Sequence, residues 1–177
     1  MRLDLVDQME RRLFLLSGVG LVLSACTTAA PTLGADGRPL PRVYKIKPGD
    51  EQAIAFRLLD SVNTLRAAKA LPALGFDASL NAAAATHSRD MSVQNRPWHF
   101  GSDGSSPLTR AQRSGFSGRV IGELISETYE TELETLSTWM AAPDTRAVIM
   151  DPTARLVGFS WFQEASGKLW WTMLTGA

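Results

Sequence analysis

The sequence predicts an α+β domain with an antiparallel sheet, and two observations lead to this fold class. Helical patterns occupy the first part of the globular region, and two strand-like apolar runs adjoin each other near the C-terminus. Strands that are neighbours in sequence favour hairpin pairing, whereas a parallel doubly wound sheet needs strands that alternate with helices. The length of 177 residues, with 45% hydrophobic and 20% charged residues, is typical of one compact domain.

Charge and rare residues exclude several classes of function. The chain has 18 basic and 18 acidic residues, and no basic cluster. A neutral chain of this kind is a poor candidate for nucleic-acid binding. One cysteine and two histidines exclude an intrachain disulfide, a cysteine-rich zinc site and a three-histidine metal site.

Residues 1–25 are predicted to be a lipoprotein signal peptide. Arg11 and Arg12 precede the short apolar run 13–23, which is too short to span a bilayer comfortably. The run ends in Leu-Ser-Ala-Cys at 23–26, which resembles a lipobox, the site where a peptidase cuts before a lipidated cysteine. We therefore expect Cys26 to carry lipid and to bind the membrane. A buried free cysteine in a core helix is the alternative.

The expected location is the bacterial cell envelope, with the export route left open. The segment 10–15 resembles a twin-arginine signal, although Glu10 replaces the usual Ser or Thr, so general secretion remains an alternative. In a Gram-negative cell, Thr27 after the cysteine would indicate the outer membrane, with the domain facing the periplasm.

The segment 26–50 is predicted to be a tether, because prolines and glycines are interleaved there and apolar periodicity is absent. Its part 43–46 alternates in polarity and is either a short strand or a segment laid on the domain. The domain itself is expected to span 51–177 and to be monomeric.

The elements of the domain follow from spacing and caps. Apolar residues at helical spacing predict a helix over 51–70, and Asp77 is the expected N-cap of a second helix that Asn95 ends. Further expectations are short helices at about 106–114 and between Pro143 and Pro152, a helix over 131–141, and strands at 119–126, 155–163 and 168–174.

An ordered series of motifs resembles the CAP superfamily of cysteine-rich secretory, antigen five and pathogenesis-related proteins, including its bacterial SCP-like members. The resemblance covers about 51–174. The matching motifs are Asn63-Thr64-Leu65-Arg66, Leu71-Pro72-Ala73-Leu74, His87-Ser88-Arg89-Asp90-Met91, His99, Asp103-Gly104-Ser105, Arg110, Gly122-Glu123, Trp139, Pro143, Arg146, Val157-Gly158 and Trp171-Thr172. The resemblance implies an α-β-α sandwich around a central antiparallel sheet.

The resemblance also implies a cavity that can hold a divalent metal between two histidines and acidic residues. His99 and Glu123 match two of these positions, and both are candidate catalytic residues. Thr145 replaces the second histidine, and Asp144 lies one residue out of register. Zinc prefers three or four protein ligands, so we expect no cofactor, or at most weakly bound zinc.

Other polar residues have simpler interpretations. His87 shares an apolar helix stripe and is expected to be a hydrogen-bonded core residue. His99 either lines the cavity or anchors its loop. Glu123 lies in an apolar strand and needs partners if it is buried. Ser105 and Ser106 lack a nucleophile-elbow pattern and are better explained as helix-capping residues.

Two hypotheses for the function remain. The first is a non-catalytic envelope module that binds a lipid, a glycan or a protein. The second is a metal-assisted or acid/base hydrolase that uses His99 and Glu123. The missing second histidine and the absence of an evident nucleophile favour the first hypothesis.

Replacing Cys26 by Ser removes the thiol that accepts the lipid. We expect the precursor to stay uncut, or the domain to be released from the membrane, because stable anchoring needs more than one acyl chain. Fractionation and labelling with a radioactive fatty acid measure this outcome. A Cys26→Ser chain that still fractionates as mature lipoprotein would show that the lipobox interpretation is wrong.

Overall fold

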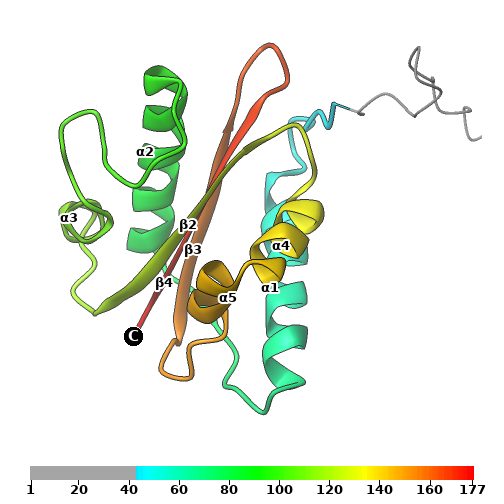
Figure 1. Cartoon of the computed structure of the whole chain (residues 1–177), viewed down its shortest axis with the longest axis vertical. Coiled ribbons are helices and arrows are strands. Elements are labelled where there is room, and N and C mark those ends of the chain that lie inside the picture. Colours follow the sequence, from blue (N-terminus) through cyan, green and yellow to red (C-terminus); the bar gives the residue numbers. More distant parts are fainter. Residues whose placement is uncertain (1–42) are drawn as a thin grey trace, which may run out of the picture. The chain divides into compact units, whose positions relative to one another are not determined.

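The computed structural model describes residues 43–177, which form an α-β-α arrangement (Figure 1). Helices α2 and α3 lie on one side of the sheet, and α1, α4 and α5 lie on the other. In chain order the elements are α1 (Glu51–Ala67), β1 (Gly75–Phe76), α2 (Ala78–Gln94), α3 (Pro107–Arg113), β2 (Val120–Thr128), α4 (Glu132–Ala141), α5 (Pro143–Ile149), β3 (Leu156–Gln163) and β4 (Leu169–Gly176). The described part of the chain contains no helix long and apolar enough to cross a membrane.

The sheet has the strand order β1-β3-β4-β2. Strand β4 is central and pairs antiparallel with both β2 and β3. The expected C-terminal hairpin is therefore present, and its turn places Gly167 at φ +94°, a left-handed conformation that glycine adopts without strain. Strand β1 pairs with Leu156 and Val157 in parallel, so the sheet is mixed rather than purely antiparallel. Sequence patterns missed β1 because two residues carry no periodicity.

Side-chain caps begin three of the helices, and the sequence predicted two of these caps, at Asp77 and Ser106. Asp77 accepts a hydrogen bond from Leu80 N at the start of α2, and Ser106 caps α3 ahead of Pro107. Thr131 and Glu134 form a reciprocal capping box at α4. The first helix ends at Ala67, three residues earlier than expected, because Ala68–Ala70 continue as a turn.

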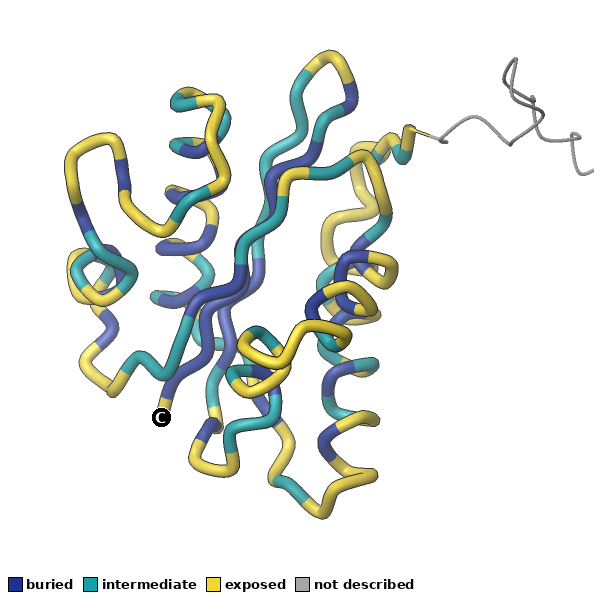
Figure 2. The backbone as a smooth tube through the Cα atoms, in the orientation of Figure 1, coloured by how far each residue is buried: buried dark blue, intermediate teal, exposed yellow. Residues whose placement is uncertain are grey.

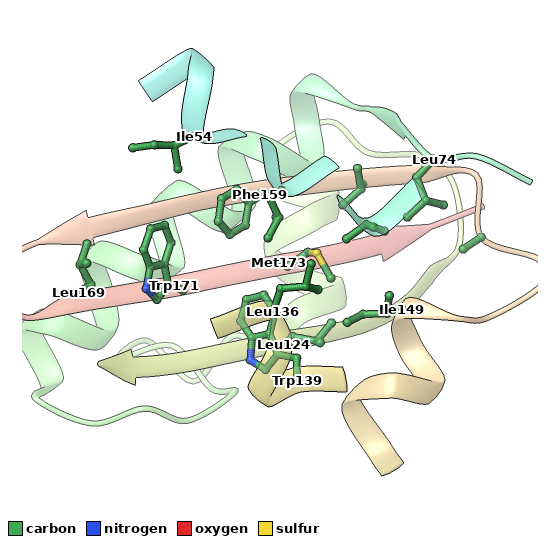
Figure 3. Packing of buried hydrophobic residues seen from close by; sticks show 14 residues of the cluster. Ile54, Leu74, Leu124, Leu136, Trp139, Ile149, Phe159, Leu169, Trp171 and Met173 are labelled. Carbon is green, nitrogen blue, oxygen red and sulfur yellow. The ribbon is translucent and has the colours of Figure 1, made fainter. Parts of the chain in front are cut away.

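The main core lies between the sheet and α1, α4 and α5 (Figure 3). A smaller cluster lies under α2 and α3, so β4 is buried on both faces (Figure 2). The neighbouring indoles of Trp170 and Trp171 point to opposite faces, and both are fully buried. The third indole of the hairpin, Trp161, is only partly buried.

Glycine allows α2 to approach the sheet closely. A Cβ on Gly158 would lie 2.2 Å from the backbone carbon of Leu80, so any side chain there would push the helix away. The run of small residues 82–85 belongs to this helix. The position of α2 also fixes His87, which this helix carries and which lies 3.6 Å from Glu123.

The segment 43–46 forms no strand and lies on the domain. Tyr44 N donates to Tyr129 O, and Ile46 N donates to the side-chain oxygen of Gln163. Tyr44 and Ile46 also pack against the main core. The expected signal peptide, Cys26 and the tether up to residue 42 lie outside the described residues.

Arg66 is a fully buried structural connector. Its guanidinium donates to four backbone carbonyls, two of which belong to Ile149 and Ala154 and lie 2.6 Å and 3.1 Å from it. These bonds join the end of α1 to the turn after α5. The Asn-x-x-Arg motif thus has a structural explanation, to which Asn63 adds two hydrogen bonds with the backbone of Leu74.

Replacing Arg66 by Met should destabilise the fold strongly. The substitution keeps the aliphatic volume but leaves buried carbonyls without donors, at a cost of about 3 kcal/mol or more in the free energy of unfolding. Urea denaturation measures this loss. The exposed control Lys69→Met should change stability by less than about 0.5 kcal/mol. Equal stability of the two variants would contradict this structural role.

Candidate functional site

A buried carboxylate, Glu123, occupies the centre of the candidate site. Strand β2 directs it toward the α2–α3 side, while its neighbour Leu124 enters the main core. Only 1% of the Glu123 side chain is exposed. A carboxylate in such a place needs partners, and it has two strong ones.

The first partner is Arg110 of α3. Its Nη2 donates to Glu123 Oε2 over 2.6 Å, and only 5% of the arginine side chain is exposed. Its Nη1 donates to the backbone oxygens of His99 and Ser105, at 3.0 Å and 2.7 Å. Arg110 thus balances the buried charge and also positions the loop that carries His99.

The second partner is His99. Its Nδ1 lies 3.0 Å from Glu123 Oε1, and about half of its side chain is exposed. When Nδ1 carries the proton and donates to the carboxylate, Nε2 is left as an acceptor. Many hydrolases use a histidine base that a carboxylate orients in this way. Their reaction also needs a nucleophile and an oxyanion site.

His87 is the buried neighbour of this pair. Its Nε2 lies 2.9 Å from Trp98 O and 3.6 Å from Glu123 Oε1. Burial lowers the pKa of His87, while the nearby Glu123 charge partly opposes this shift. The ring is therefore neutral near pH 7 and donates from Nε2 to the Trp98 carbonyl. This confirms the expected hydrogen-bonded core histidine and adds an unexpected proximity to Glu123.

The loop between α2 and α3 is fixed by two aspartates. Asp90 accepts hydrogen bonds from the backbone N and the hydroxyl of Ser102, at 2.7 Å and 2.6 Å. Asp103 accepts from Ser105 N and pairs with Arg113. The hydrogen bonds from Ser105, and then the one from Arg113, hold the pKa of Asp103 well below its usual range. These contacts explain the Asp-Gly-Ser motif as loop structure.

A groove of about 450 Å³ lies beside this loop. The residues that line it are polar or charged, and they include both positive and negative groups: Thr86, Asp90, Ser102, Asp103, Ser105, Arg110, Arg113 and Ser114. Arg110 belongs to both the groove and the Glu123 cluster, and its buried Nε has no hydrogen-bond partner. The cluster and the groove are therefore adjacent parts of one polar region.

The described residues do not fit a metal ion. No group of three or more His, Cys, Asp or Glu side chains among them could hold one. Glu123 is engaged by Arg110 through one oxygen and by His99 through the other. A zinc ion at this place would have to displace a buried charge pair.

Thr145 and Asp144 were assigned to the same cavity from the family pattern. The hydroxyl of Thr145 donates to Trp139 O and Ala142 O, which joins α4 to α5. Asp144 is exposed. No hydrogen bond or ion pair within residues 43–177 connects either residue to His99 or Glu123, and their cavity role stays a prediction.

The serines near His99 act as structural groups. Ser106 Oγ accepts from Thr109 N and caps α3, as expected. Ser105 is buried, and its backbone N–H donates to Asp103. Neither hydroxyl is hydrogen-bonded to His99 in the described structure. The pairing of Arg110 with Glu123 was not predicted from the sequence, although a buried glutamate signals the need for a buried cation.

The family model for the cysteine-rich secretory protein (CAP) family matches residues 59–174. The chain belongs to the CAP family. A comparison with curated proteins gave no significant match. Because the chain has one cysteine, its CAP domain lacks the disulfides that the family name suggests.

Solved structures of bacterial proteins share this fold. An outer surface protein of Borrelia burgdorferi is 16% identical, with a TM-score of 0.66 over 76% of this chain and 98% of that one. An extracellular SCP-domain protein of Bacillus anthracis is 20% identical, with a TM-score of 0.66 over 75% of this chain. A cysteine-rich secretory protein of Staphylococcus aureus is 10% identical, with a TM-score of 0.65 over 81% of this chain. The match spans 44% of each of the last two proteins.

The lowered pKa of His87 predicts an acid-sensitive fold. In the unfolded chain this histidine gains a proton below about pH 6.5, whereas the folded chain resists protonation. The contribution of the neutral His87 to the free energy of unfolding is therefore complete above about pH 6.5. It is lost as the pH falls from there toward the pKa of His87 in the folded chain. Its slope is at most about 1.4 kcal/mol per pH unit.

Urea denaturation of the wild type and of His87→Gln, between about pH 7.5 and about pH 5.5, measures this contribution. The Gln side chain can still donate to Trp98 O, so the variant should fold and show a weaker loss of stability in acid. The matched variant His99→Gln should keep the acid sensitivity that depends on His87. An unchanged pH dependence in His87→Gln would show that His87 is not its source.

Proposed function

We propose that this CAP domain is an exported, non-catalytic binding module. The observation that carries the proposal is the state of Glu123: its carboxylate is buried and held by Arg110 and His99. A group engaged in this way is unavailable as a free base or as a metal ligand. Its role is to fix the His99 loop, which forms one side of the polar groove.

Among the three proposed classes of ligand, lipid, glycan and protein, the polar groove favours a ligand rich in hydroxyl groups. Its lining offers paired donors and acceptors, with two arginines and two aspartates whose formal charges cancel. Neutral, hydroxyl-rich ligands such as glycans match such a lining, whereas an acyl chain would remove its charged groups from water and offer them no hydrogen bond. The groove volume of about 450 Å³ lies within the range of small-ligand sites.

Export is supported by the predicted signal peptide and by the solved relatives, which include an outer surface protein and an extracellular protein. We propose that lipid on Cys26 anchors the chain in the cell envelope and that the tether holds the domain away from the membrane. In this location a glycan of the envelope is within reach of the groove.

Hydrolysis is the second candidate, and one observation favours it. His99 is half exposed and is oriented by a buried carboxylate, as a general base would be. No serine or threonine hydroxyl is hydrogen-bonded to His99 within residues 43–177. The candidate therefore needs a nucleophile that substrate or water would supply.

The binding function predicts saturable binding of a neutral oligosaccharide by the full chain. Calorimetric titration with chitotetraose, an N-acetylhexosamine tetramer, measures it, and chromatography of the same mixture measures cleavage. We expect binding without cleavage. Arg113→Gln should weaken binding about tenfold, since a hydrogen bond between charged and polar groups contributes about 1.5 kcal/mol.

Lys69→Gln, on an exposed surface away from the groove, is the matched control and should bind like the wild type. Vesicles containing phosphatidylglycerol serve as a parallel probe for a lipid ligand. Cleavage that disappears in His99→Ala would establish the hydrolase instead. Binding to vesicles in place of the oligosaccharide would overturn the preference for a glycan.

A further inference from the structure

The outer edge of β3 is paired along only part of its length. Strand β1 covers Leu156 and Val157, and it contains only two residues. The next part of β3, from Phe159 to Phe162, has no strand partner on this side within the described structure. This free edge is separate from the Glu123 cluster, because β4 lies between β3 and β2.

Backbone groups on this edge lack partners. Glu164 N donates to Lys168 O at the end of the β3–β4 ladder, and hydrogen-bonding direction alternates along a strand. Phe159 and Trp161 therefore direct their backbone groups away from β4. The N–H of Phe159 is taken up by the side chain of Asn81, at 2.7 Å. No hydrogen bond within residues 43–177 takes up the N–H or C=O of Trp161.

The residues of the free stretch itself do not protect this edge. Natural proteins blunt free strands with proline, lysine, inward-pointing charges or bulges, because an open edge invites another strand. The free stretch Phe-Ser-Trp-Phe contains none of these residues, and the β3–β4 register shows no bulge. An unprotected edge of this composition is suited to strand addition.

A groove of about 540 Å³ runs along the free edge. The first turns of α1 and α2 form its two walls, and the residues that line it are Glu51, Gln52, Ala55, Asn81, Ala82, Ala85, Phe159, Ser160 and Trp161. Three of the wall residues are alanines, which leave room beside the strand. A single extended chain would meet only these two helices, whereas the sheet edge of a second copy would bring its own flanking helices against them.

We propose that the free edge of β3 binds an extended, basic peptide segment of a partner protein as an additional strand. Glu51 is the only charged residue in the groove lining, so the lining favours lysine or arginine on the α1 side. The exposed Ala82 and Ala85 favour small side chains on the α2 side. Alternating basic and small residues meet both requirements, because successive side chains of a strand point to opposite faces.

The test uses the full chain and the peptide acetyl-Thr-Lys-Ala-Lys-Ala-Lys-Thr-amide. Hydrogen exchange followed by NMR should show that the Trp161 amide exchanges rapidly in the free protein and slowly in the complex. Two modified peptides carry N-methyl groups on either the alanine or the lysine nitrogens. Only every second N–H of an added strand faces the edge, so one version should lose binding and the other should keep it.

Variants locate the site. Ala82→Arg should weaken binding at least tenfold, because the arginine fills the α2 side of the groove where the peptide's alanines lie, and Glu51→Gln should weaken it about threefold. The exposed substitutions Ala53→Arg and Asp60→Asn, outside the groove lining, are the matched controls and should bind like the wild type. Glycan binding at the Arg113 groove should remain unchanged in all four variants, which separates this proposal from the proposed function.

Three results would overturn the proposal. One is a Trp161 amide that already exchanges slowly in the free protein at high dilution, which would place the chain's own N-terminal segment on the edge. The second is slow exchange that disappears on dilution, which would place a second copy there. The third is equal binding of both N-methylated peptides, which would exclude strand pairing.

Discussion

The ion pair between Glu123 and Arg110 is the interaction on which the candidate site depends. Both side chains are buried, and removing either partner would leave an uncompensated charge, at a cost of about 3–5 kcal/mol. The pair also positions the His99 loop, because the guanidinium of Arg110 donates hydrogen bonds to the backbone oxygens of His99 and Ser105. One buried charge therefore connects β2, α3 and the loop that borders the polar groove.

The sheet separates the larger apolar core from the candidate site. The larger apolar core lies against α1, α4 and α5, where Arg66 ties the chain turns together through backbone carbonyls. The other side has a smaller apolar cluster and the polar contacts of α2 and α3. Strand β4 is buried along its whole length and separates the two sides of the sheet. Residues of the polar region can therefore be substituted without disturbing the main core.

The free edge of β3 adds a second surface of different chemistry. The Glu123 region offers side chains, whereas the edge offers backbone donors and acceptors between two helices. A small strand β1 and a single Asn81 side chain cover the beginning of that edge, and the rest stays open in the described structure. The two proposed sites do not overlap, because β4 lies between β3 and β2 in the sheet.

The sequence by itself determined the fold class, the helix caps at Asp77 and Ser106, the C-terminal hairpin and the family, because caps, periodicity and short motifs depend on residues close together in the chain. It also indicated that a buried Glu123 needs partners. Only the tertiary structure decided which partners these are: Arg110 from a helix, His99 from a loop and His87 from another helix. The parallel strand β1 and the open edge of β3 were likewise decided by long-range pairing, which leaves no periodic signal in a segment of two to four residues.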